Sequence, residues 1–385
     1  MPPLPTTAAM TDDSTHRTEP RQDQRPGRRR FNQTERITTR LKDLVRSYPK
    51  GLALVKEFLQ NADDAGATDL RVIYDRRTHT GTFQASPGME VALGPALLFF
   101  NDRWFAEDDF AGIQHIGEGS KACDASRTGR FGQGFNTCYS VTDHPSLMTR
   151  IHVGDDVDAH GQIQPQYETG VAWFDPHQRV AFQDEDGIQN AYAWDLWYAQ
   201  ERWHDWIRTF APAPPHNHWN PKSDTFPGTV FRLPLRSADD VQRSEIFKET
   251  FLDKHFDDIL KEIQKVGPAL LVFLRSVMSL EIREIDVKGQ DSIRYWIATG
   301  GDGKEVAEKR KILRDAVHGD PKERLEQWRN TQEPLPVVQF DHPFYIVDID
   351  GTEREETWAV TTGLFRGAND DLLGAALEIW RHRSE

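Results

Sequence analysis

Cysteine is scarce in this chain of 385 residues, where only Cys123 and Cys138 occur. A fold held together by several disulfide bonds is therefore excluded. Long apolar runs are missing as well: the longest, 93–100 and 268–274, are far shorter than the roughly 20 residues that span a bilayer. Residues 1–30 contain no apolar segment typical of a secretory signal peptide. These absences predict a cytoplasmic protein with no membrane partner.

An excess of positive charge is also absent, since 47 Lys and Arg residues stand against 61 Asp and Glu residues. The formal net charge of -14 argues against nonspecific attraction to DNA or to anionic membranes. The exception is Arg25–Arg30, with the sequence Arg-Pro-Gly-Arg-Arg-Arg. This patch is either part of a disordered tail or a contact for nucleic acid.

Hydrophobic periodicity predicts helices and strands in a mixed order rather than in strict alternation. Such a mixture favours an α+β fold. We expect helices at 34–48, 52–65, 192–210, 240–266, 303–330 and 369–381. We expect strands near 70–74, 93–101, 147–153, 168–174, 228–235 and 280–287, and a hairpin or meander over 337–365.

The predicted helix 52–65 carries a carboxylate, a carboxamide and a second carboxylate at Glu57, Asn61 and Asp64. Because successive helical residues turn by about 100°, these three side chains share one face. The pattern alone is that of an amphipathic helix with a solvated polar face.

A glycine-rich turn, Gly129–Gly134, lies about seventy residues further along. Its three glycines remove side chains where a backbone must approach a ligand closely, and free N–H groups can bind phosphate oxygens. It lacks the Gly-Lys-Ser/Thr of the P-loop, and no βαβ unit surrounds it. Together with the helix it predicts a nucleotide site, in which Asn61 coordinates Mg²⁺ and Glu57 accepts the proton of the attacking water.

These two segments resemble the N-box and a glycine box of the GHKL superfamily of ATPases, which includes gyrase, heat-shock chaperones, histidine kinases and MutL. The chain is most similar to the ATPase-like domain of the sacsin N-terminal type. The similarity begins at 31–34 and continues through 57–68, 94–102, 112–121 and 129–143. It ends at Phe226–Arg236, and so covers most of residues 31–236 in order.

The resemblance implies a GHKL (Bergerat) α/β sandwich, in which helices cover one face of a mixed sheet. It implies that Glu57 is the catalytic base, that Asn61 is the Mg²⁺ ligand and that Asp64 lies near the nucleotide. Ser120 and Lys121 would belong to a mobile lid, and Thr229 would support recognition of adenine. The phosphates of ATP would be held by residues of the glycine box: Gly129, Arg130, Phe131, Gly132, Gln133, Gly134 and Phe135.

One departure from the superfamily concerns the base. The usual Asp-x-Gly-x-Gly box is replaced by 101–105, with the sequence Asn-Asp-Arg-Trp-Phe and no glycine. Asn101 takes the place of the adenine-binding aspartate, unless the alignment shifts to Asp102. A carboxamide offers both an acceptor oxygen and an NH₂ donor, so nucleotide affinity and base selectivity are open.

The sequence therefore predicts three regions: a disordered basic and Pro-rich tail (1–30), the ATPase domain (31–240) and a C-terminal α/β extension of unknown role (241–385). The leading hypothesis is a slow Mg-ATPase that works as a conformational switch, either chaperone-like or as the ATPase subunit of a larger assembly, for example one in bacterial defence. It would bind ATP and ADP, with unknown protein clients or partner subunits. The alternatives are a nucleotide-binding or scaffold module without useful catalysis, and a subunit acting on nucleic acid through Arg25–Arg30.

Overall fold

The computed structural model describes residues 35–47, 51–81, 88–113, 134–157, 161–180, 189–213, 218–220, 226–318, 338–366 and 372–382. Ile37–Glu385 form one compact unit. The predicted tail 1–30 lies outside the described residues, so its disorder and its nucleic-acid contact stay predictions.

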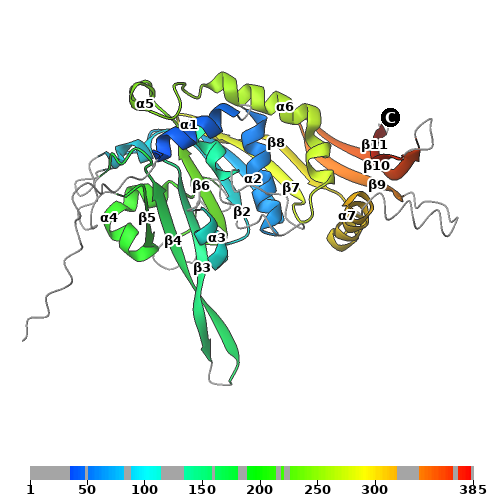
Figure 1. Cartoon of the computed structure of the whole chain (residues 1–385), viewed down its shortest axis with the longest axis horizontal. Helices are drawn as coiled ribbons and strands as arrows, with labels where there is room; N and C mark the ends of the chain where they lie inside the picture. Colours follow the sequence, from blue (N-terminus) through cyan, green and yellow to red (C-terminus); the bar gives the residue numbers. More distant parts are fainter. Residues whose placement is uncertain are drawn as a thin grey trace, which may run out of the picture. The chain divides into compact units, whose positions relative to one another are not determined.

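Helices and strands are mixed along the chain, as expected (Figure 1). The helices are α1 (Ile37–Ser47), α2 (Leu52–Asp64), η1 (Met89–Leu93), α3 (Glu107–Ile113), η2 (Phe135–Ser140), α4 (Leu196–Arg208), α5 (Ala238–Arg243), α6 (Asp253–Val272) and α7 (Gly303–His318), where η marks a 3₁₀ helix. The strands are β1 (Asp69–Asp75), β2 (Ala96–Asn101), β3 (Ser146–Val157), β4 (Ile163–Phe174), β5 (Ala191–Asp195), β6 (Thr229–Pro234), β7 (Ser279–Ile285), β8 (Asp291–Thr299), β9 (Val338–Val347), β10 (Glu353–Arg366) and β11 (Leu372–His382).

The described strands form a single sheet in the order β11-β10-β9-β8-β7-β1-β2-β6-β3-β4-β5. Neighbours pair antiparallel except β1 and β7, which are parallel, with Leu70 opposite Leu280. The predicted mixed sheet is confirmed. Strands β7 to β11 come from the region predicted as a C-terminal extension, and they continue the same sheet. A domain boundary at 240 stays a prediction.

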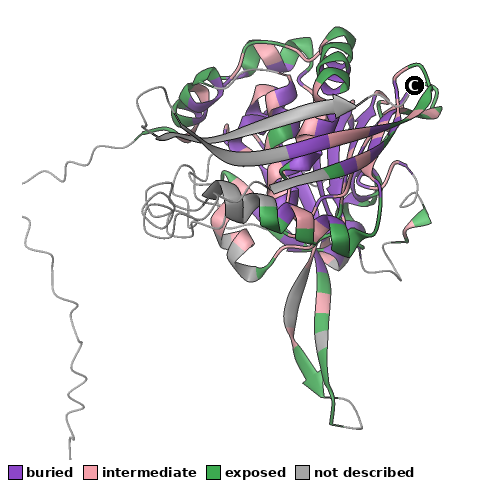
Figure 2. Cartoon of the chain, turned by 90° about the vertical axis from the view of Figure 1, so that its right-hand side faces the viewer, coloured by how far each residue is buried: buried purple, intermediate pink, exposed green. Residues whose placement is uncertain are grey.

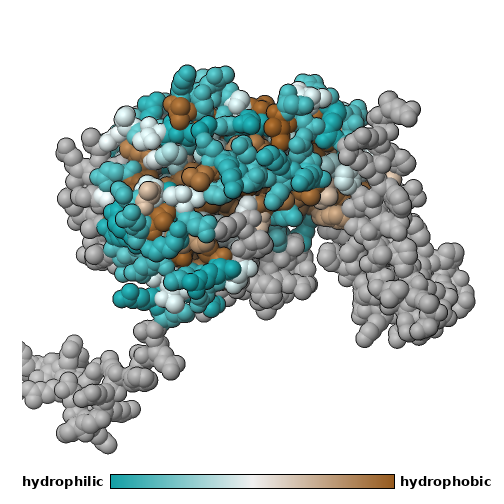
Figure 3. Space-filling view, turned by 90° about the horizontal axis from the view of Figure 1, so that it is seen from above, coloured by the Kyte–Doolittle hydropathy of each residue, from teal (hydrophilic) through white to brown (hydrophobic). Residues whose placement is uncertain are grey.

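A layer containing α1, α2 and α6 packs on one face of the sheet. Its contact with the sheet is apolar: Phe58 of α2 stacks on Phe99 of β2 with ring centroids 4.0 Å apart and meets Phe231 of β6 edge-on. Ile263 of α6 and Leu41 of α1 are fully buried in the same core. Figure 2 shows the buried residues gathered in the sheet and on the helix sides that face it. The outward surface of this layer is mainly hydrophilic (Figure 3).

The opposite face of the sheet has its own smaller core beneath η1 and α4. Trp173 of β4 contacts Trp206 of α4, and both indoles are fully buried. Trp203 is 3% exposed. The tryptophan-rich stretch therefore packs on the sheet, as predicted, although residues 191–195 form a strand before the helix begins. Helical cover is thus present on both faces of this half of the sheet, beyond the predicted cover of one face.

Two predicted helices are wrong. The stretch 240–266 is not one helix but α5 and α6, separated where the Ser244 hydroxyl donates a hydrogen bond to the buried Asp143 and accepts N–H groups from Ile246 and Phe247. The predicted helix 369–381 is strand β11, which pairs antiparallel with β10. Its Leu- and Ala-rich sequence favours a helix locally, but the open edge of β10 supplies hydrogen bonds that override this preference.

Candidate functional site

Helix α2 presents Glu57 at the helix-covered face of the sheet. The helix forms where Leu54, Phe58 and Leu59 repeat at helical spacing, and all three are buried. It ends at Asp64, and Gly66 follows with a φ of 77°, a conformation that favours glycine just after a helix. Glu57 is half-buried, and desolvation raises the pKa of its carboxyl above 4.5. No described side chain forms a hydrogen bond or ion pair with it.

The structure brings the end of the glycine turn against this helix. A β-carbon added to Gly134 would collide with the Glu57 carboxylate and would lie 3.7 Å from Nδ2 of Asn61. Gly134 has φ -56° and ψ -50°, so close approach, and not backbone conformation, accounts for glycine here. The structure therefore places Gly134, the last residue of the predicted turn, against the polar face of the helix.

Helix η2 follows directly from Gly134. The carbonyl of Gly134 accepts the N–H and the hydroxyl of Thr137, which fixes the first turn. The N–H groups of Gly134 and Phe135 meet no acceptor among the described residues. The Phe135 ring packs between Phe174 and Phe231 at 5.2 and 5.7 Å, so it is part of the core and not a phosphate contact. Only the backbone of Phe135 can serve the predicted role.

A buried arginine anchors the far end of η2. Arg236 donates to the carboxylate of Asp143 at 2.7 Å and to the carbonyls of Ser140, Thr142 and Tyr139. Burial lowers the pKa of its guanidinium, while Asp143 opposes this shift. Sequence reasoning gave Arg236 no role. The available signal was an arginine that follows the mainly apolar stretch 229–235, because such a residue is buried only with partners.

Several predicted residues fall outside the described part of the chain. They are Ser120 and Lys121 of the expected lid, and Gly129, Arg130, Phe131, Gly132 and Gln133 of the glycine box. Their roles stay predictions.

The other end of the candidate site is formed where β2 meets β6 and β3. Asn101 lies opposite Thr229, and Thr229 lies opposite Thr149. Strand side chains alternate between faces, and Phe99 and Phe231 face the helix layer. Asn101 and Thr229 are two residues from them, so they face the same layer as Glu57. The alignment of Asn101 with the base position is therefore compatible with the structure.

Asp102, the other candidate at this position, has a different task. Its carboxylate accepts the N–H of Thr68 at 2.7 Å, the hydroxyl of Thr68 at 2.6 Å and the N–H of Asp69 at 3.3 Å. These bonds fasten the segment after β2 to the turn that follows α2. The side chain is thus occupied within the protein, and Asn101 is the better candidate for a contact with the base.

The two acidic residues at the end of α2, Asp63 and Asp64, differ in burial and in their contacts. Asp64 is half-buried on the polar side of the helix. Its neighbour Asp63 is 5% exposed and accepts the backbone N–H groups of Arg275, Ser276 and Val277. It ties α2 to the loop before β7. Sequence reasoning missed Asp63, although its place in the apolar stripe, four residues after Leu59, was a usable signal.

Two glycines allow the close approaches at this site. Besides Gly134, Gly228 lies so near β2 that an added β-carbon would collide with the carbonyl oxygen of Asn101. Because that obstacle is backbone, it cannot turn aside as a flexible side chain would. The absence of a side chain at Gly228 therefore permits this close approach of the two strands.

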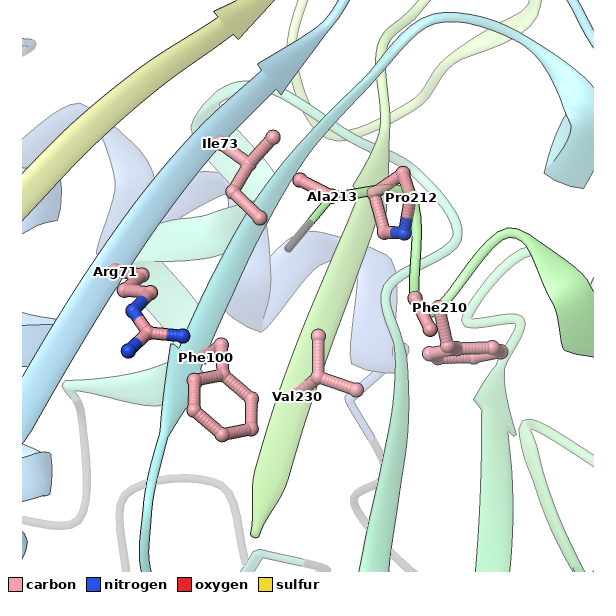
Figure 4. Close-up of a pocket in the computed structure, with 8 residues that line it drawn as sticks. Arg71, Ile73, Phe100, Phe210, Pro212, Ala213 and Val230 are labelled. Atoms are coloured by element: carbon pink, nitrogen blue, oxygen red, sulfur yellow. The ribbon is translucent and has the colours of Figure 1, made fainter. Parts of the chain in front are cut away.

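Metal ligands and pockets add two observations. Among the described residues, no group of three or more His, Cys, Asp or Glu side chains could hold a metal ion. A pocket lies on the opposite face of the sheet, lined by Arg71, Ile73, Phe100, Phe210, Ala211, Pro212, Ala213 and Val230 (Figure 4). It is separated from Glu57 by the sheet.

No described helix is long and apolar enough to cross a membrane.

Comparison with known proteins identifies the family. The model of the sacsin domain matches residues 34–294, more than half of the chain. The chain belongs to the sacsin-domain family. Human sacsin is 28% identical over 331 residues, which is 86% of this chain but 6% of sacsin. The chain thus spans only a small part of the length of that relative.

Two solved structures show weaker likeness. The N-terminal domain of a DNA repair protein is 9% identical, with a TM-score of 0.34 over 85% of this chain and 71% of that one. The B-subunit of the DNA gyrase from Myxococcus xanthus is 11% identical, with a TM-score of 0.30 over 85% and 62%. Likeness of this size carries no functional argument, so the identification depends on the sequence.

Proposed function

We propose that this sacsin-domain protein is a slow Mg-ATPase that uses nucleotide binding to drive a change of shape. The observation that carries the proposal is the contact between Gly134 and the polar face of α2 at Glu57 and Asn61. At this contact the Glu57 carboxylate, the Asn61 carboxamide and the backbone of Gly134 lie close together. The proposal also draws on the resemblance of these segments to the GHKL superfamily.

In this proposal Glu57 is the general base for hydrolysis. It accepts a proton from the water that attacks the γ-phosphorus, as the bond between that phosphorus and the bridging oxygen to the β-phosphate breaks. The products are ADP and inorganic phosphate. Desolvation raises the pKa of Glu57, which makes its carboxylate a stronger base than an exposed one. The N–H groups of Gly134 and Phe135 suit phosphate oxygens.

One of the residues present, Asn61, offers a suitable oxygen ligand for Mg²⁺. Magnesium commonly keeps several waters and is held by one or two protein oxygens together with substrate phosphates, so a dedicated cluster of ligands is not required. The carbonyl oxygen of Asn61 would be the protein ligand. When bound, Mg²⁺ would neutralise charge on the phosphates. The clash of an added Gly134 β-carbon with Glu57 shows that the approach to these donors has little spare room.

The test is turnover of Mg-ATP by the protein, by Glu57→Ala and by the matched control Lys56→Ala. Lys56 is the exposed neighbour of Glu57 on the same helix. We expect Glu57→Ala to bind ATP and to lose turnover by about 100-fold or more, while Lys56→Ala behaves as the parent. Equal hydrolysis by all three proteins would remove Glu57 from the role of base.

A second candidate function is a binding or scaffold module without useful catalysis. It is favoured by the base end of the site, where Asp102 and the hydroxyl of Thr229 are engaged within the protein. Calorimetry with ATP, ADP and GTP separates the two candidates. Absence of heat with every nucleotide at millimolar concentration would leave the scaffold. Protein clients, partner subunits, a cytoplasmic location and a contact of Arg25–Arg30 with nucleic acid remain part of the proposal.

A further inference from the structure

The direction of the hydrogen bonds at the base end of the site can be assigned. Asn101 Oδ1 accepts the backbone N–H of Arg103 at 3.0 Å. An N–H group can only donate, so this bond fixes which way the carboxamide is turned. The oxygen of Asn101 is directed to its own chain, and the NH₂ group is the part left for a ligand. No described residue accepts a hydrogen bond from that NH₂ group.

Thr229 is committed in the same way. Its hydroxyl donates to the carbonyl of Arg103 at 2.7 Å, which uses its single hydrogen. The hydroxyl of Thr149, 2.7 Å away, must therefore donate to Thr229, and Thr149 itself accepts the N–H of Phe105 at 3.1 Å. Thr229 is 1% exposed, which shields the remaining lone pair of its oxygen from a ligand.

The chain of bonds from Phe105 through Thr149 and Thr229 to Arg103 is complete. It holds residues 103–105, and the backbone of Asn101 lies so close to Gly228 that a side chain there would collide with it. The segment is also fastened on its other side, where Arg103 Nε donates to the carbonyl of Gly66 at 2.8 Å. The orientation of the Asn101 amide is thus built into the fold rather than chosen by a ligand.

Among the side chains described at this end of the site, a purine would meet one donor without a partner, the NH₂ group of Asn101. The 6-amino group of adenine is itself a donor and would face the NH₂ group of Asn101 unpaired. The 6-oxo group of guanine or hypoxanthine is an acceptor and would pair with it. A buried polar group left unpaired lowers affinity, so the two classes of purine are not equivalent here.

We propose that this site binds 6-oxopurine nucleoside triphosphates at least as tightly as ATP, with Asn101 as the residue that sets this selectivity. The inference rests on the proposed function, because it concerns the base of the nucleotide at that same site. The proposed difference from an ATP-selective site is one atom: the Asn101 carboxamide presents its nitrogen, a donor, where an aspartate would present an acceptor oxygen.

The experiment compares the affinities of ATP, ITP and GTP for the protein, for Asn101→Asp and for Gln242→Glu. ATP and ITP differ only at the edge formed by position 6 and N1 of the base, where an amino group and an acceptor nitrogen are replaced by an oxo group and an N–H group. Their ratio therefore reports on contacts with this edge. Asn101→Asp keeps an oxygen for the Arg103 N–H and replaces the NH₂ donor with an acceptor. Gln242→Glu makes the same change of charge at an exposed site on α5. Thermal melting of each variant confirms that it is folded.

We expect the parent and Gln242→Glu to bind ITP and GTP at least as tightly as ATP. In Asn101→Asp the ratio should shift toward ATP by about 10-fold, the effect of one buried hydrogen bond gained and one lost. A parent that prefers ATP by 10-fold, or a ratio unchanged in Asn101→Asp, would overturn the inference while leaving the nucleotide site intact. Failure of all three nucleotides to bind the parent would overturn the proposed function itself.

Discussion

The two ends of the candidate site differ in whether their polar groups are hydrogen-bonded within the protein. At the phosphate end, the Glu57 carboxylate has no partner among the described side chains, and Gly134 contributes no side chain at all. At the base end, Asn101, Thr229 and Thr149 are linked to backbone groups of 103–105. A polar group without a partner in the protein can react with a ligand. A polar group that is hydrogen-bonded within the protein is held in one position. If the proposed function is correct, catalysis and base recognition should respond to different substitutions.

The largest effect should come from breaking the phosphate end. In Gly134→Ala the added methyl group would displace the Glu57 carboxylate, although an alanine backbone fits this conformation without strain. We expect turnover of ATP to fall by about 100-fold, because displacement of a catalytic group by about 1 Å has that cost. Steady-state phosphate release measures it. Gly303→Ala is the control, since nothing lies within 4 Å of a β-carbon there.

The base end should respond in stability before it responds in rate. In Gly228→Ala the methyl group meets the backbone of Asn101 and Asp102, which can yield only by moving β2 against β6. We expect the free energy of unfolding to fall by about 2 kcal/mol or more. Chemical denaturation measures this loss. A variant as stable as the parent would show that the strands separate easily here.

A smaller effect is expected from Thr149→Val, which keeps the shape of the side chain and removes its hydroxyl. The N–H of Phe105 would lose its acceptor, and Thr229 would lose its donor. We expect a loss of about 1–3 kcal/mol of unfolding free energy with little change in kcat. Thr299→Val serves as the comparison, because the hydroxyl of Thr299 bonds only weakly, to the sulfur of Met278 at 3.5 Å. Equal losses would argue against a special role for the chain of hydroxyls.

The smallest effect concerns pH and the stability of the phosphate end. The pKa of Glu57 is raised in the folded state, so the folded protein binds a proton more tightly than the unfolded chain. Its contribution is fully present below about pH 4.5 and is lost as pH rises through the raised pKa. Glu57→Gln should therefore raise the melting temperature relative to the parent at pH 7–8 but not at pH 4. The same difference at both values would contradict the burial of this carboxylate.

Local sequence patterns carry part of the candidate site but not its long-range contacts. Helical spacing predicts that Glu57 and Asn61 share one face, and Gly134 lies close to both, while the predicted role of the glycine box toward a phosphate stays a prediction. Burial of Asp63 and Arg236 depends on backbone groups far away in sequence, and no local pattern reveals them. The engagement of Asp102 with Thr68 is of the same kind.

The errors in secondary structure have a similar cause. Strand β11 has the composition of a helix, and its strand conformation follows from pairing with β10. The break between α5 and α6 follows from Ser244, whose partner Asp143 lies 101 residues earlier in the chain. The α+β class and the mixed sheet could be predicted because they depend only on the kinds of elements present. A local sequence pattern does not reveal which residue far away in the chain will pair with a strand or end a helix.

The parallel pair of β1 and β7 has a consequence for biosynthesis. Asp69 and Ser279 lie side by side in the sheet although they are 210 positions apart in the chain. At ribosomal rates, β1 leaves the ribosome about 10 to 40 seconds before its neighbour has been translated. During that interval one edge of β1, which includes the buried residues Leu70, Val72 and Ile73, lacks its partner in the final sheet. The nascent chain is thus expected to need protection from premature pairing until β7 emerges.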